Sequence, residues 1–320
     1  MIKEISKSIR EYKRTSIATP VLVSLEVVIE CIIPFLIAKL VNEIKSGCEL
    51  NLIIKYGIIL FIMAVLSLLF GALAGATCAN ASCGLAKNLR RDMFYNIQKY
   101  SFENIDKFLT SSLVTRLTTD VTNVQNAYMI IRSAIRAPLM IIFALVMAFI
   151  MGGKMAWIFL FVVPFLTVGL SVIVYKTMPL FRKVFKKYDN LNNSVQENIK
   201  GMRVVKAFVR EDYEQKKFDA AASDVCADFT KAERILALNN PLMQFCLYVN
   251  MTFVLSFGSY TIITSRGMDL DVGQYSALLT YGFMMLASLM MLSMIFVMIT
   301  MAAESGKRIA EILTEKSTLT

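Results

Sequence analysis

Two glutamates interrupt an otherwise apolar stretch near the N-terminus. Glu26 and Glu30 are four residues apart, so a helix would place both side chains on one face, one turn apart. A carboxylate is costly in an apolar environment and usually faces a cavity or a partner. Three interpretations are open: the pair lines a pathway and favours cationic ligands, one member binds and releases a proton, or both hydrogen-bond structurally to a neighbouring helix. Pathway lining is favoured over the structural pair, and proton coupling ranks last.

The sequence has no histidine and six cysteines. The commonest metal ligand and proton shuttle is therefore missing, and no metal site is predicted. Most of the cysteines fall in apolar segments, where small residues serve helix packing, so a disulfide framework is not expected.

Methionines gather in the last apolar stretch. Five of them recur near one face of a predicted helix: Met284, Met291, Met294, Met298 and Met301. Methionine adapts its shape to varied apolar groups, so this face suits a flexible pocket for a drug or a lipid. Ordinary lipid-facing or helix-packing residues explain the same pattern equally well.

A glycine motif occurs in a different apolar run. The sequence GALAG, Gly71 to Gly75, predicts that this helix packs closely against another helix.

A third set of residues lies in a basic segment between apolar runs. Gln196 to Glu211 contains four cations beside the apolar residues Met202, Val204, Val205 and Phe208. Gly201 provides a flexible point, and we predict that the chain turns there. Apolar side chains at such a turn have no lipid to cover them, which indicates either a partner surface or contacts that hold two helical arms together.

Composition indicates a membrane protein. The 320 residues are 56% hydrophobic, with a net charge of +10. Apolar runs predict six membrane helices, at Ile17 to Val41, Leu52 to Thr77, Ala137 to Gly152, Met155 to Tyr175, Ile235 to Ser265 and Gly273 to Ala303.

The connections between these helices differ in length and charge. The outer ones are short, whereas the inner ones, about 78–136 and 177–234, are long and carry helical periodicity. Of the 34 Lys and Arg residues, nearly all lie in these loops or at the termini, which predicts that both loops and both termini are cytoplasmic. Each loop is predicted to be a helical hairpin that continues the membrane helices. Residues 1–14 predict an amphipathic helix on the inner membrane surface.

Four stretches resemble the transmembrane domain of ATP-binding cassette (ABC) exporters. They are TSSLVTRLTTDV (Thr110 to Val121, with Arg116 and Asp120 at typical positions), ENIKGMRVVKAFVRE (Glu197 to Glu211), LDVGQYSALLTY (Leu270 to Tyr281) and AAESGKRIAEIL (Ala302 to Leu313). The second matches the family's second coupling helix and is the most specific. Two features depart from the family: Ser111 stands where glycine is usual, and the sixth helix lacks a central proline.

The resemblance implies an all-α membrane fold with six transmembrane helices and long cytoplasmic helical extensions, the type IV transporter fold of type I exporters. It covers residues 15–313, with 314–320 as the start of a linker to a nucleotide-binding domain. It implies a second transmembrane subunit, which the fourth and fifth helices reach, and ATPase domains that dock on two tips. The residues implied at those contacts are Asn104, Ile105, Asp106, Phe108, Thr110, Ser111, Gly201, Met202, Arg203, Val205, Lys206 and Phe208. The residues predicted from their types and spacing to line a pathway are Glu26, Glu30, Met284, Met291, Met294 and Met298.

The phosphate-binding loop of the family, G-x-x-x-x-G-K-[ST], is absent from the sequence. We therefore expect no catalytic residue or cofactor on this chain, with ATP and Mg²⁺ bound by an ATPase domain. That domain is either missing by truncation, which is favoured, or supplied by a separate chain. The implied function is export of a drug, lipid or peptide from a bacterial cytoplasm. The rivals are a proton-coupled carrier that uses Glu26 or Glu30, an importer with the same fold, and a membrane scaffold.

Overall fold

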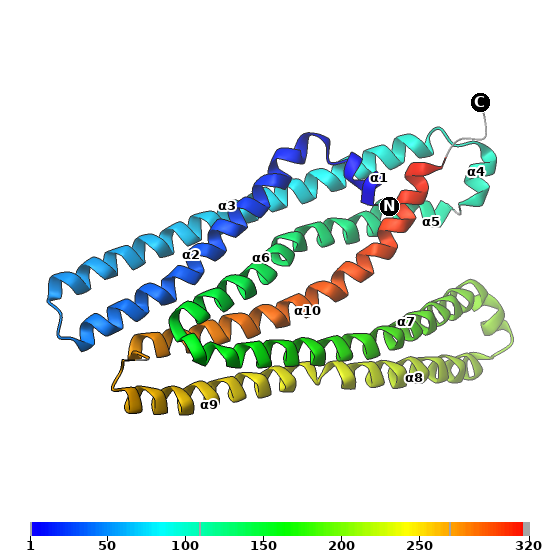
Figure 1. Cartoon of the computed structure of the whole chain (residues 1–320). Helices are drawn as coiled ribbons and strands as arrows, with labels where there is room; N and C mark the ends of the chain where they lie inside the picture. Colours follow the sequence, from blue (N-terminus) through cyan, green and yellow to red (C-terminus); the bar gives the residue numbers. More distant parts are fainter. Residues whose placement is uncertain (1, 109, 269, 316–320) are drawn as a thin grey trace. The chain divides into compact units, whose positions relative to one another are not determined.

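The computed structural model describes residues 2–108, 110–268 and 270–315, and no β-strand occurs among them (Figure 1). In chain order the elements are α1 (Ile2–Lys7), η1 (Arg10–Tyr12), α2 (Lys13–Lys45), α3 (Leu50–Ile97), α4 (Phe102–Lys107), α5 (Thr110–Thr115), η2 (Arg116–Asp120), α6 (Val121–Gly152), η3 (Gly153–Ala156), α7 (Trp157–Ala207), α8 (Glu211–Leu236), α9 (Asn239–Ser265) and α10 (Val272–Thr314).

Five helical segments in the described part of the chain are long and apolar enough to cross a membrane: Arg10–Lys45, Leu50–Ile97, Ser112–Phe181, Glu211–Ser265 and Val272–Phe296. The third contains the short helix η3, which separates α6 from α7. Gly153 turns the chain there with a φ of 48°, a conformation that favours glycine. The six predicted spans therefore correspond to α2, α3, α6, α7, α9 and α10, and the protein is an integral membrane protein.

Several helices are much longer than a bilayer requires. α3 has 48 residues and α7 has 51, whereas about 20 suffice for a crossing. At ~1.5 Å per residue these helices extend over roughly 72 to 77 Å. The predicted helical continuation of the membrane helices is thus confirmed.

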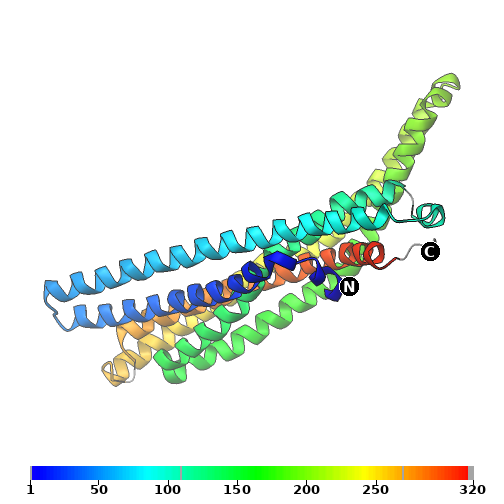
Figure 2. The same ribbon diagram turned by 90° about the horizontal axis from the view of Figure 1, so that it is seen from above.

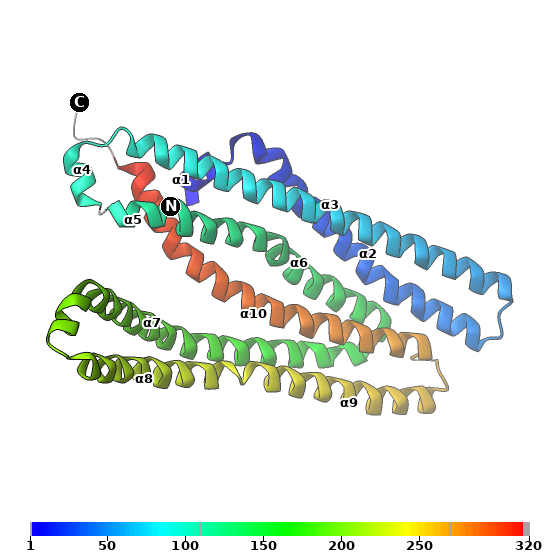
Figure 3. The ribbon, with the colours of Figure 1, turned by 180° about the vertical axis from the view of Figure 1, so that it is seen from behind.

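The chain divides into two compact units, of which the first is Met1–Val163 with Val249–Thr320. Figure 2 shows α2 and α3 as a long antiparallel pair, and Figures 1 and 3 show α6 beside α10. Buried apolar side chains of α2, α6 and α10 form one core, in which the Tyr281 hydroxyl donates to the Cys31 carbonyl at 2.7 Å. A second core joins α3, α6 and α10, with Leu89, Val121 and Ile309 fully buried.

The N-terminal segment differs from the predicted amphipathic helix over 1–14. It is split into α1 and η1, and Ile5 and Ile9 pack against the second core. Asp92 of α3 accepts hydrogen bonds from Ser8 (2.7 Å) and Arg10 (2.8 Å). Part of the apolar stripe is therefore covered by protein, because polar contacts fix the segment on α3.

The second unit, Pro164–Tyr248, holds most of α7, all of α8 and the start of α9. Phe181 and Phe229 meet edge to face, with ring centroids 5.9 Å apart. Lys187 Nζ lies 2.8 Å from Asp228 Oδ2. The hydrogen bond to Asp228 raises the pKa of Lys187. These contacts align the two arms of the second predicted hairpin, α7 and α8.

The turn of this hairpin is not at Gly201. That residue lies inside α7, which continues to Ala207, and the chain reverses over residues 208–210. Val209 adopts a φ of 50° there, an unfavourable conformation for a β-branched residue. The prediction was wrong because the apolar pattern of Met202 and Val205 continues the helix past the glycine, whose helical penalty is only about 1 kcal/mol.

Candidate functional site

The two glutamates of α2 meet two arginines of α6. Arg132 Nη2 donates to both carboxylate oxygens of Glu26 at 3.1 Å, and Arg136 Nη2 donates to both oxygens of Glu30 at 2.7 Å. Arg136 Nη1 also lies 3.7 Å from Glu26. We name these four residues the charge cluster. Each helix contributes residues four positions apart, so the pairs form along one face of each helix.

The charge cluster has no net charge when all four groups are ionised. Glu26 is 5% exposed, and a buried carboxylate without a partner would be strongly destabilising. The sequence did not predict that arginines neutralise these glutamates. Arg132 and Arg136 precede the apolar run of α6, so they were assigned to the cytoplasmic loop. The α2 carboxylates therefore do not by themselves give the site a negative charge.

The glycines of GALAG make room for the charge cluster. A Cβ at Gly71 would lie 3.0 Å from Glu26 Oε1, and one at Gly75 would lie 3.3 Å from Arg132 Nη1. Both distances are tighter than ordinary van der Waals contacts. The small residues of α3 therefore allow the charged side chains to lie between helices, in addition to the close helix packing that the sequence predicts.

A cavity of about 470 Å³ adjoins the cluster. It brings together Glu30, Met284 and Met291, three of the predicted pathway residues. The described residues of its lining come from α2, α6 and α10 and are Glu30, Ile33, Pro34, Ile37, Arg136, Ala137, Met140, Thr280, Phe283, Met284, Ala287, Ser288 and Met291. The lining does not include Glu26, which is covered by its arginine partners.

The other predicted methionines lie elsewhere. Met294 and Met298 are 63% and 41% exposed and do not line this cavity. The side chain of Met301 lies outside the described residues. The methionine face of α10 is therefore divided between a cavity wall and an open surface.

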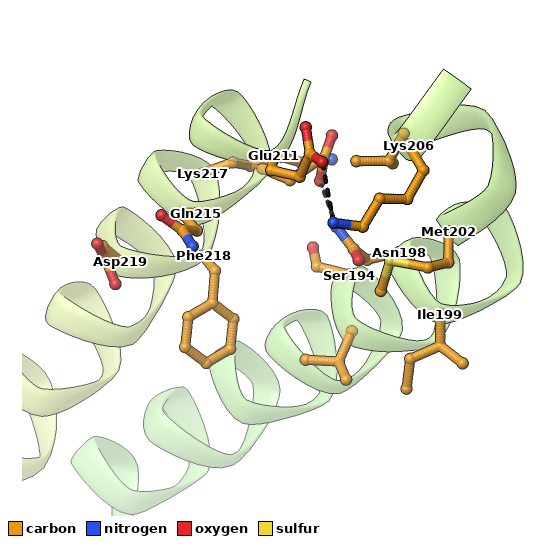
Figure 4. A pocket seen from close by; sticks show the side chains of 13 residues that line it. Ser194, Asn198, Ile199, Met202, Lys206, Glu211, Gln215, Lys217, Phe218 and Asp219 are labelled. Atoms are coloured by element: carbon orange, nitrogen blue, oxygen red, sulfur yellow. Dashed lines mark hydrogen bonds and ion pairs between the residues drawn. The ribbon is translucent and has the colours of Figure 1, made fainter. Parts of the chain in front are cut away.

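The tip of the second hairpin contains a groove of about 660 Å³ (Figure 4). Met202 and Val205 line it from α7, and Phe218 lines it from α8. Lys206 Nζ lies 2.9 Å from Glu211 Oε1 and bridges the two helices across the turn. Of the five predicted contact residues in α7, Met202 and Val205 line the groove and Lys206 forms the bridge, whereas Gly201 and Arg203 are not among its lining residues. The Arg203 side chain is exposed.

The turn itself is apolar and open to solvent. Phe208 is 72% exposed and Val209 is 81% exposed. Only Phe208 was among the predicted contact residues. Val209 was missed because the turn was placed at Gly201.

The first tip is folded more tightly than the sequence suggests. Ser101 and Asn104 form a capping box at the start of α4, and Asn104 is 3% exposed. Phe108 is also buried and stacks on Tyr100, with ring centroids 6.0 Å apart. Burial raises the pKa of Tyr100 to about 12. Asn104 and Phe108 therefore stabilise the tip, whereas Phe102, which sequence reasoning missed, is 85% exposed.

Four further residues predicted at this tip cannot be placed in the same way. The side chains of Ile105, Asp106, Thr110 and Ser111 lie outside the described residues.

Two of the family-like stretches meet behind this tip. Asp120 lies at the end of the π-helical turn η2 and is 1% exposed. It accepts hydrogen bonds from Ser305 Oγ (2.8 Å) and from Arg308 Nε (2.8 Å) and Nη2 (2.5 Å). The bond to Asp120 raises the pKa of Arg308. Arg116 adds a second bridge, with Nη1 lying 2.8 Å from Glu311 Oε2. We name these five residues the α10 clamp.

The fold and these sites define a helical membrane transport domain. The family of ABC transporter transmembrane regions matches residues 17–290, and the chain belongs to this family.

Several other ABC transporter proteins are similar to the chain. It is 30% identical over 294 residues to YfiB, an ABC transporter ATP-binding protein of Bacillus subtilis, which covers 92% of this chain and 51% of YfiB. It is 28% identical to the B. subtilis ABC transporter ATP-binding protein YknU over 72% of this chain and 39% of YknU. It is 27% identical to the ATP-dependent lipid A-core flippase of Pseudomonas fluorescens over 72% of this chain and 38% of the flippase. The chain spans about half the length of YfiB, the relative with the highest identity among these three.

Proposed function

We propose that the chain is the membrane half of an ATP-driven exporter that moves an amphipathic substrate out of a bacterial cytoplasm by alternating access. A second transmembrane subunit, identical or related, completes the pathway. ATPase domains dock on the two cytoplasmic tips, bind ATP and Mg²⁺, and drive the switch. The chain itself hydrolyses no ATP, since its sequence lacks the phosphate-binding loop.

The exposed apolar turn of the second hairpin carries this proposal. Phe208 and Val209 directly follow α7, a helix of 51 residues, and an apolar run of about 20 residues already spans a bilayer. Lipid therefore does not cover these side chains, and exposed apolar groups at such a tip indicate a protein partner. The names of YfiB and YknU as ATP-binding proteins, and the chain's partial coverage of them, support an ATPase as that partner.

Binding of an ATPase chain tests the proposal. The chain is co-expressed with a candidate ATPase chain, and the amount that copurifies is compared between variants. Burial of an exposed Phe side chain contributes about 1.5–3 kcal/mol, so Phe208→Ser is expected to weaken the association roughly 10- to 100-fold. Tyr188→Ser is the matched control, because Tyr188 is 52% exposed on the arm of α7 rather than at its tip. Equal binding by both variants would show that the tip does not couple the chain to an ATPase.

A proton-coupled carrier gives the opposite pattern. Its transport would depend on a proton gradient rather than on ATP, and Glu30→Gln would abolish it without any change in ATPase binding. The ion pair of Glu30 with Arg136 gives the carboxylate a structural partner, which makes this alternative less well supported.

A further inference from the structure

The cavity beside the charge cluster presents one charge of each sign. Among the lining residues that the structure describes, Glu30 is the acidic one, Arg136 is the basic one, and all the others are apolar or carry a hydroxyl group. Both charged side chains remain partly open, at 21% exposed for Glu30 and 32% for Arg136. A bound molecule can therefore reach both groups.

The remaining half of the charge cluster keeps this balance fixed. Arg132 pairs with Glu26, so the charges behind the cavity wall also sum to zero. A ligand with a single charge would be attracted by one charged group of the wall and repelled by the other. It would also lose its hydration on binding, so its net binding energy would be small. A ligand with both charges can place its cation at the Glu30 carboxylate and its anion at the Arg136 guanidinium.

Arg136 has the donors that such a ligand needs. A guanidinium carries five N–H groups in a planar fork that matches the oxygens of a phosphate or a carboxylate. The hydrogen bonds to Glu30 use only Nη2, and Nη1 lies 3.7 Å from Glu26 Oε1, which is an ion pair beyond hydrogen-bond distance. The guanidinium therefore keeps donor capacity for an anionic group on the ligand.

The rest of the wall is suited to an alkyl chain. Ile33 and Ile37 of α2 face the same cavity as Phe283, Met284 and Met291 of α10. Flexible methionines adapt to chains of different shape. A cavity of about 470 Å³ falls within the usual range for small-molecule sites.

We propose that this cavity binds a zwitterionic amphiphile, a molecule with an anionic and a cationic group close together on one apolar chain. The inference rests on the proposed transport function and specifies the substrate class for it. The headgroup chemistry is shared by membrane phospholipids and by small soluble zwitterions, and the apolar wall favours the amphiphile.

A headgroup series tests the inference directly. The purified chain in the neutral detergent dodecyl maltoside is titrated with dodecylphosphocholine, dodecyltrimethylammonium and dodecyl sulfate, and bound ligand is counted by native mass spectrometry. These probes share one chain length and differ in headgroup charge. Dodecylphosphocholine is expected to bind at least about tenfold more tightly than either singly charged probe, which corresponds to ~1.4 kcal/mol. Phosphocholine without a chain separates the two sources, because it should bind much more weakly than the amphiphile.

Charge variants should change the preferred headgroup in opposite directions. Glu30→Gln leaves the cluster with a net positive charge and should shift the preference to dodecyl sulfate. Arg136→Gln leaves a net negative charge and should shift it to dodecyltrimethylammonium. The double exchange Glu30→Arg with Arg136→Glu should retain the zwitterion preference. Arg10→Gln is the control, because it removes an arginine from an ion pair on Asp92, in a different part of the fold.

Two outcomes would overturn the inference: no preference for the zwitterion in the unaltered chain, or the same headgroup ranking in both single variants. If a charge variant fails to fold, Ala287→Phe fills the cavity from α10 with the charges intact and should abolish the preference. Failure of the proposed function is distinguished by ATPase copurification. A chain that binds the ATPase but shows no headgroup preference refutes this inference alone.

Discussion

The α10 clamp predicts an unusual order of stability among three variants. Asp120 is buried, whereas the Arg308 side chain is 49% exposed. Removal of either partner breaks the same ion pair but leaves a different residue behind. Asp120→Asn leaves an arginine that water can solvate, and Arg308→Gln leaves a buried carboxylate without its cation.

The expected losses of stability follow from the difference in burial between Asp120 and Arg308. Two hydrogen bonds from Arg308 to a charged acceptor contribute roughly 3–6 kcal/mol before solvation is counted. Because the guanidinium is half exposed and water replaces part of that interaction, Asp120→Asn should cost about 2 kcal/mol. An orphaned buried charge typically costs about 3–5 kcal/mol, so Arg308→Gln should cost more. The double variant should be more stable than Arg308→Gln alone, because it removes the orphaned charge.

The assay is the free energy of unfolding of the four proteins, measured by titration of mixed micelles with SDS and followed by circular dichroism. The double-mutant cycle gives the coupling between Asp120 and Arg308. Lys307→Gln serves as a control, since Lys307 and Glu304 form an exposed pair that should contribute less than about 1 kcal/mol. The reasoning is refuted if Arg308→Gln costs no more than Asp120→Asn, or if the two changes are additive.

Three further predictions concern other parts of the fold. Burial raises the pKa of Tyr100 to about 12. The neutral Tyr100 hydroxyl therefore contributes fully to the free energy of unfolding below pH 10, and this contribution is lost as the pH rises to 12. Over that window the unaltered chain should lose about 3 kcal/mol more stability than Tyr100→Phe, and equal pH profiles would contradict this. A Cβ at Gly273 would overlap the carbonyl oxygen of Ala38, so Gly273→Ala should cost about 3 kcal/mol in the same SDS titration. Gly57→Ala, with open space around it, is the control and should not destabilise the protein. Val209→Gly should stabilise the second hairpin by about 1 kcal/mol because it relieves the positive φ, as measured by amide hydrogen exchange of α8; faster exchange would count against a strained turn.

The apolar runs were sufficient to predict the fold class and the spans. A membrane helix that is apolar on all sides can be recognised without knowing which helices it contacts. For this reason α2, α6 and α10 were recognised from the sequence. The long arms were also predictable, because their helical periodicity continues beyond the membrane segments.

The positions that depend on contacts between helices were not predictable. Gly201 suggested a turn, but the chain reverses over residues 208–210, because the apolar pattern of Met202 and Val205 continues α7 past the glycine. Arg132 and Arg136 were counted with the cytoplasmic cations because nothing in the sequence indicates which helix face meets Glu26. The inward side chain of Phe108 likewise depends on its stacking against Tyr100.

The neutrality of the charge cluster bears on the electrical work of moving a molecule across the membrane potential. Moving one elementary charge across a membrane potential of 100 mV involves about 2.3 kcal/mol. If the chain exports its ligand as proposed, the cluster adds no net charge to the occupant of the cavity, so the charge that crosses is that of the cargo alone. A cargo with equal and opposite charges would then cross without work against the membrane potential, and its rate of export is expected to be the same in polarised and depolarised cells.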